Sequence, residues 1–116
     1  MNEETEPIPK TWRATVASIL REGKTGTVFI RQRARRDWAH LTSCPFDVTL
    51  REVLAEALDV DSLVGKKYEI NEPGETYGFI FHYGRQTIYA KVNLAIHDKV
   101  VIVYSAHRPL QGEELI

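Results

Sequence analysis

The stretch from Tyr77 to Pro109 decides the fold, and it reads YGFIFHYGRQTIYAKVNLAIHDKVVIVYSAHRP. It contains three runs rich in β-branched and aromatic residues, separated by the short segments Tyr83-Gly84-Arg85 and His97-Asp98-Lys99. Such runs, divided by turn residues, are typical of antiparallel strands joined by tight turns. The sequence therefore predicts an antiparallel β-meander in this stretch.

Upstream of the meander, two segments place apolar residues at helical spacing. The first runs from about Thr11 to Glu22, and Gly23 is placed to end it. The second begins near Thr49, which with Glu52 three residues later forms the pattern of a capping box. We expect a helix in each segment.

Two further strands are expected outside the meander. In residues 27–35, successive side chains would point to alternate faces of a strand, and residues 66–71 form a second short strand. We expect residues 37–47 to be irregular. The predicted order is α-β-α-β-β-β-β. This order favours an α+β domain with two helices packed on one face of a twisted antiparallel sheet of about four or five strands.

Length and composition fit one soluble globular domain. The chain has 116 residues, of which 43% are hydrophobic and 27% charged. We expect residues 10–112 to form the domain, residues 1–9 a flexible acidic tail and residues 113–116 a second tail. The sequence lacks an apolar run of the roughly 20 residues that a membrane span needs. Cys44 is the single cysteine, which fits a reducing cytoplasm.

The net charge of −1 hides an uneven distribution. All 15 lysines and arginines lie between Lys10 and Gly112, whereas five of the 16 acidic residues lie in the two tails. A mildly basic body between acidic tails is compatible with a nucleic-acid surface and does not demand one.

An arginine-rich segment follows the first predicted helix, with Arg31, Arg33, Arg35 and Arg36. On a strand, alternate arginines would lie about 6.6–6.8 Å apart on one face, which roughly matches the phosphates of an extended single strand. Guanidinium groups bind phosphate in a bidentate manner. We expect an RNA-binding row, with a solvated face, apolar cover or an acidic protein partner as alternatives. The acidic N-terminal tail could fold back over this row.

A second group lies on the last two predicted strands. If these strands pair through the His97-Asp98-Lys99 turn, Tyr89 lies opposite Ala106 or His107, and Lys91 lies opposite Ser105. Tyr89 and His107 would then be neighbours on one face.

This second group has the residue types that RNA cleavage needs. Histidine exchanges protons near neutral pH, and lysine or arginine stabilises a charged phosphate transition state. With Arg85 and Arg108, the group could support metal-independent attack of a ribose 2′-OH on the adjacent phosphate. The alternative is a core tyrosine beside an exposed strand end. His40 and His82 are weaker candidates, and the histidine spacing gives little support for a metal site.

The strand pair Ile88-Tyr89-Ala90-Lys91-Val92 and Val100-Val101-Ile102-Val103 resembles that of the motility quorum-sensing regulator (MqsR) family of type II toxin ribonucleases. The ending Val103-Tyr104-Ser105-Ala106-His107-Arg108 is similar to the closing strand of RelE-type toxins. The resemblance implies an α+β ribonuclease that cuts mRNA without a metal and is inhibited by a cognate antitoxin. It also implies functional roles for Tyr89 and for His107, which stands where the family has a lysine.

Together these features favour a cytoplasmic, metal-independent endoribonuclease (mRNA interferase) of a bacterial toxin–antitoxin system that uses no cofactor. The predicted catalytic residues are His107, Tyr89, Lys91, Arg85 and Arg108, and the predicted RNA-binding residues are Arg31, Arg33, Arg35 and Arg36. The expected partners are an RNA substrate and a cognate antitoxin. The alternatives are a non-catalytic protein- or nucleic-acid-binding module of accessory or immunity type, and an enzyme of another class.

Overall fold

A computed structural model of the chain describes residues 5–70, 73–95, 97 and 99–110. The α+β class expected from the sequence is confirmed. Within the described residues there are three helices rather than two, and six strands rather than four or five. In chain order the elements are β1 (Thr5–Pro7), α1 (Lys10–Glu22), β2 (Val28–Ile30), α2 (Gln32–Thr42), α3 (Asp47–Leu58), β3 (Val64–Tyr68), β4 (Glu75–Tyr83), β5 (Gln86–Ala95) and β6 (Val100–His107).

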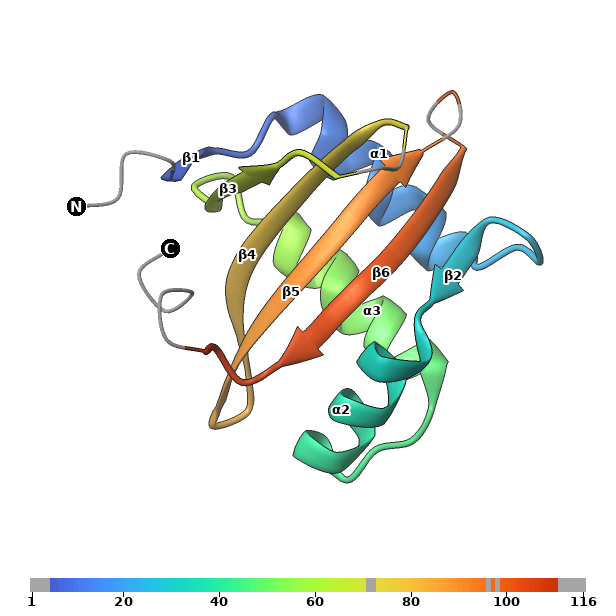
Figure 1. The fold of residues 1–116 in the computed structure, drawn as a ribbon, viewed down its shortest axis with the longest axis vertical. Helices are drawn as coiled ribbons and strands as arrows, with labels where there is room; N and C mark the ends of the chain where they lie inside the picture. Colours follow the sequence, from blue (N-terminus) through green and yellow to red (C-terminus); the bar gives the residue numbers. More distant parts are fainter. Residues whose placement is uncertain (1–4, 71–72, 96, 98, 111–116) are drawn as a thin grey trace.

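The strands form one sheet in the order β1-β3-β4-β5-β6-β2. The predicted meander forms its centre as β4, β5 and β6, which pair antiparallel. The sheet is mixed, because β2 lies parallel to β6 at one edge, whereas β1 lies antiparallel to β3 at the other. Figure 1 shows the long central strands with these short strands on either side.

The hydrophobic core lies between the sheet and the helices, with buried residues from α1, α2 and α3. In Figure 1, α1 and α3 lie behind the sheet, and the opposite face of the central strands, called the open face below, is turned toward the viewer. Trp12, Val16 and Leu20 of α1 are buried at helical spacing, as the sequence predicted. Alternation along β5 turns Ile88, Ala90 and Val92 toward the same core and the residues between them toward the open face.

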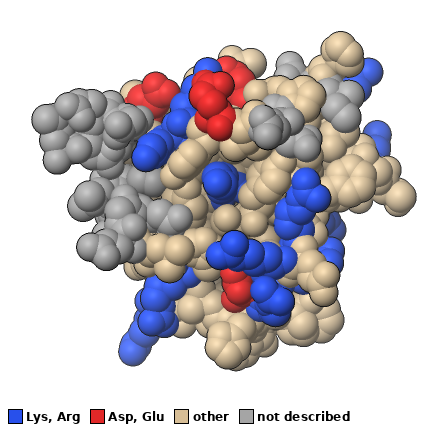
Figure 2. All heavy atoms as spheres, in the orientation of Figure 1, with Lys and Arg blue, Asp and Glu red and all other residues tan. Residues whose placement is uncertain are grey.

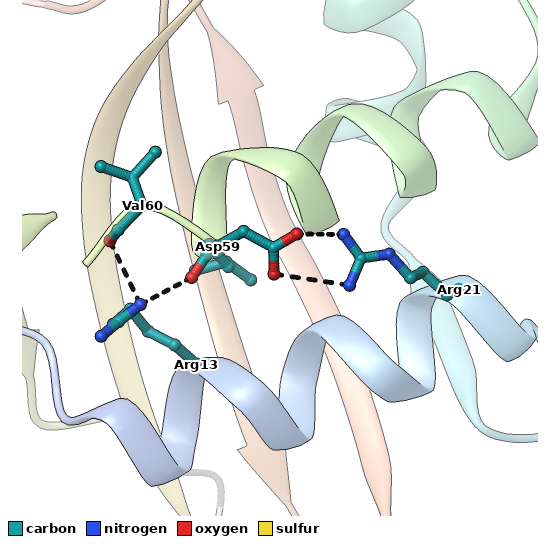
Figure 3. Close-up of polar contacts among 5 residues, drawn as sticks. Arg13, Arg21, Asp59 and Val60 are labelled. Atoms are coloured by element: carbon teal, nitrogen blue, oxygen red, sulfur yellow. Dashed lines mark hydrogen bonds and ion pairs between the residues drawn. The ribbon is translucent and has the colours of Figure 1, made fainter.

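A buried arginine joins α1 to the end of α3. Arg13 is 5% exposed, and its guanidinium donates hydrogen bonds to the carbonyl oxygens of Leu58 at 2.9 Å and Val60 at 3.1 Å. Its Nε also donates to the carbonyl oxygen of Ile8 at 3.1 Å. Figure 3 shows this arginine beside the Arg21–Asp59 ion pair. The cation satisfies carbonyl groups that the end of α3 leaves without helical partners.

The strand predicted for residues 27–35 is wrong beyond Ile30. Strand β2 has three residues, and α2 begins at Gln32 and continues to Thr42, through much of the segment expected to be irregular. Ala34 and Trp38 explain the difference, because they are buried one helical turn apart and give α2 its apolar face. Arginine, glutamine and alanine are also good helix formers, so arginines at alternate positions are equally compatible with a helix.

Two other boundaries differ from expectation. Helix α3 begins at Asp47, so Thr49 lies inside its first turn and does not cap it. Residues 5–7 form β1 and Ile8 is 3% exposed, so this part of the expected flexible tail belongs to the domain. Because β1 and β2 lie at opposite edges of the sheet, residues 5–7 do not cover the arginine-rich segment. The tails at residues 1–4 and 113–116 lie outside the described residues.

None of the helices in the described part of the chain has the length and apolar character needed to cross a membrane.

Candidate functional site

The candidate site lies on the open face of the central strands. Figure 2 shows this face, with lysine and arginine atoms in its middle and lower parts and acidic atoms mainly near its upper edge. The register places Lys66 of β3, Gly78 of β4, Lys91 of β5 and Ser105 of β6 in one row across the sheet. A bulge at Tyr104 shifts the β5–β6 register beyond this row. The predicted pairing of Lys91 with Ser105 is confirmed.

Tyr89 and His107 face each other across β5 and β6, as one of the two predicted registers required. Their ring centroids are 5.6 Å apart and their planes are inclined by 33°. Tyr89 is 1% exposed, whereas His107 is half-buried. Nδ1 of His107 lies 2.7 Å from the carbonyl oxygen of Arg108. Because a carbonyl oxygen accepts only, Nδ1 carries the proton, and Nε2 is the ring nitrogen that can exchange one in the neutral form.

A second tyrosine fixes the position of the first. The Tyr89 hydroxyl donates a hydrogen bond to the Tyr68 hydroxyl at 2.7 Å, across the intervening strand β4. Gly78 makes this contact possible, since a Cβ atom there would collide with the Tyr89 hydroxyl and lie 2.7 Å from Cε2 of Tyr68. The sequence analysis missed both Tyr68 and Gly78. A glycine inside an otherwise apolar strand was the available signal of a close approach.

Two lysines flank the Tyr68 ring. Nζ of Lys91 lies 4.7 Å from the ring centroid, and Nζ of Lys66 lies 5.5 Å from it. Both distances allow a cation–π interaction. Neither ammonium forms an ion pair with a carboxylate of the described residues. Among the described residues, the face therefore holds two positive charges without an ion-paired acid, an arrangement suited to an anion such as phosphate.

A hollow lies next to His107, between the end of β6 and helix α2. It has a volume of about 330 Å³ and is lined by Asp37, His40, Leu41, His107 and Arg108. Arg108 follows His107 directly and is exposed. The sequence analysis gave His40 little weight and did not consider Asp37, because it placed both in an irregular segment rather than on a helix facing β6.

The structure does not form the predicted arginine row, because a helix turns successive arginines to different sides. Arg35 binds Asp47 through two hydrogen bonds of 2.9 Å, which raise its pKa above the ordinary arginine value. Nε of Arg33 lies 3.9 Å from the Asp37 carboxylate. Arg31 stands at the N-cap position of α2 without a capping hydrogen bond from its side chain, and its Cζ lies 5.2 Å from the centroid of the Tyr104 ring. Arg36 is exposed.

Arg85 is not brought to the other predicted catalytic residues. It lies in the tight turn between β4 and β5, which the pairing of Tyr83 with Gln86 closes. From there to Tyr89 the strand rises by about 13 Å. Elsewhere in the sheet, Lys67 pairs with Glu75 at 3.4 Å, and the Gln86 amide donates to the Leu41 carbonyl oxygen at 3.4 Å.

The described residues contain no group of three or more His, Cys, Asp and Glu side chains that could hold a metal ion. No family model matches the chain, and neither a curated protein nor a solved structure matches it significantly.

Proposed function

We propose that this protein is a metal-independent endoribonuclease of the toxin type, with its site at the carboxyl end of β6. The observation that supports this most is the Tyr89–His107 pair. It places a half-buried histidine on a sheet face that carries Lys91 and beside the exposed cation Arg108. A proton acceptor next to phosphate-binding cations is what 2′-OH attack requires.

The reaction follows from these positions. Nε2 of His107 takes the proton of a ribose 2′-OH as its oxygen forms a bond to the adjacent phosphorus. The bond from phosphorus to the 5′ oxygen breaks, and that oxygen takes a proton from solvent. The products are a 2′,3′-cyclic phosphate and a 5′-OH end. Lys91 and Arg108 stabilise the charge on the phosphate oxygens.

Tyr89 has a positioning role in this account. Its side chain is buried and its hydroxyl is bonded to Tyr68, so it orients the His107 ring rather than transferring a proton. The cellular setting that we propose is the cytoplasm, with a cognate antitoxin as inhibitor. The same burial of Tyr89 also suits the second candidate function, a non-catalytic binding module, because a structural tyrosine needs no reactive hydroxyl.

Incubation of the purified protein with single-stranded RNA in EDTA tests the proposal. We expect fragments ending in 2′,3′-cyclic phosphate, and we expect none from an RNA carrying 2′-O-methyl groups. Cleavage that requires an added divalent cation, or 3′-OH ends, would contradict the proposed chemistry. RNA that is bound but left intact would favour the binding module.

A further inference from the structure

The hollow between α2 and the end of β6 has the size of a small ligand site. Its volume is about 330 Å³, near the lower limit of about 300 Å³ at which ligand pockets begin. It opens next to His107, so a nucleotide whose phosphate lies at this histidine can place its base in the hollow.

The lining combines a carboxylate, a guanidinium group, two histidine rings and an apolar side chain. Asp37 and His40 lie on one side of α2, with Leu41 beside them, and Arg108 closes the opposite side. The Asp37 side chain is 32% exposed. Its one ion-pair partner in the described part of the chain is Arg33, and the contact is long, with 3.9 Å between Nε and the carboxylate oxygen. A carboxylate has about four lone-pair positions, so Asp37 keeps capacity to accept from a ligand.

We propose that this hollow is a subsite for a guanine base. Guanine offers two adjacent donors, N1–H and the 2-amino group, that fit one carboxylate, and two acceptors, O6 and N7, that fit a guanidinium group. In this subsite Asp37 accepts from N1–H and the 2-amino group, and Arg108 donates to O6 and N7. Leu41 contacts the base. Adenine and cytosine each present a single amino donor, and uracil has no amino group. The inference rests on the proposed function in taking RNA as the ligand.

The test uses binding, so that it does not depend on cleavage. The probes are two fluorescein-labelled 2′-O-methyl trinucleotides, one with guanine and one with inosine between uridines, and fluorescence anisotropy gives their dissociation constants. Inosine lacks the 2-amino group and so removes one hydrogen bond to Asp37. We expect the native protein to bind the guanine probe at least about fivefold more tightly.

The variant Asp37→Asn should bind both probes equally, because it replaces one of the two acceptor oxygens by an NH2 donor that cannot pair with the 2-amino group. The matched control is Asp61→Asn, at a carboxylate that is 91% exposed near Arg13 and away from the hollow, and it should keep the native preference.

Equal binding of the two probes by the native protein would overturn the guanine subsite, as would a preference that survives in Asp37→Asn. If RNA is cleaved without a guanine preference, the subsite fails and the ribonuclease stands. If neither probe binds and RNA is not cleaved, both proposals fail.

Discussion

His107 and Tyr89 lie directly opposite each other on β5 and β6, with ring centroids 5.6 Å apart. This contact depends on the bulge at Tyr104, which lies between His107 and the turn that joins the two strands. A bulge inserts one residue into a ladder, so without it the register would bring a different residue to Tyr89. The bulge in β6 therefore sets the register that places His107 against the buried Tyr89.

The variant Tyr89→Phe tests the link between the two tyrosines. It keeps the ring against His107 but removes the hydrogen bond to Tyr68, so we expect a loss of about 1 kcal/mol in the free energy of unfolding. Chemical denaturation measures this loss. Tyr104→Phe is the matched control, because the Tyr104 hydroxyl is buried with no hydrogen-bond partner among the residues that the structure describes, and its removal should be neutral or stabilising. An equal loss in both variants would contradict the account.

The variant Gly78→Ala should destabilise the protein by about 1–3 kcal/mol, because the added methyl group meets the Tyr89 hydroxyl and the Tyr68 ring. The double variant with Tyr89→Phe removes one of these collisions. We therefore expect Gly78→Ala to cost less in that background than in the native one, as measured by a double-mutant cycle. Additive losses would show that the hydroxyl does not occupy the space above Gly78.

The variant Arg13→Met should lose about 2–4 kcal/mol of stability, because it leaves buried carbonyl groups of α3 and of residues around it without a donor. Arg21→Met removes an exposed arginine from the same helix and should cost much less. Thermal unfolding of the two variants gives the comparison, and similar melting temperatures would refute the role assigned to Arg13.

The Arg21–Asp59 ion pair predicts a pH dependence. The hydrogen bond from Arg21 lowers the pKa of Asp59 below its ordinary value of 3.8. A lowered pKa in the folded state stabilises the protein above pH 3.8, and this contribution is lost as the pH falls through the folded value. The stability difference between the native protein and Asp59→Asn should therefore shrink between pH 5 and pH 2. A difference that stays constant over this range would count against the pair.

The central strands and their register could be predicted from the sequence because the period of side-chain alternation and the positions of the turns agree there. The expected pairing of Lys91 with Ser105 is found, but the pairs next to the turn are offset by one residue, and the bulge at Tyr104, which was not predicted, restores the expected register. The strand prediction was wrong in the α2 region, because three arginines at alternate positions suggested a strand. The helix forms there because it buries Ala34 and Trp38 where α2 packs on β6. Tertiary packing overrode the local pattern at this point.

The site was predictable only within the meander. Tyr89, Lys91 and His107 lie on strands adjacent in sequence, so their proximity followed from one turn. Tyr68 and Asp37 come from elements that are distant in sequence from His107. Their places depend on the strand order across the whole sheet and on the packing of α2, which no local pattern specifies.

The most direct test of the central claim is growth on induction of the intact gene, compared with His107→Ala and with His82→Ala. His82 is an exposed histidine on β4 and serves as the matched control. We predict growth arrest with cleaved total RNA for the intact protein and for His82→Ala, and normal growth with intact RNA for His107→Ala. Arrest and RNA cleavage that persist in His107→Ala would contradict the site, and normal growth with intact RNA in all three would contradict the ribonuclease itself.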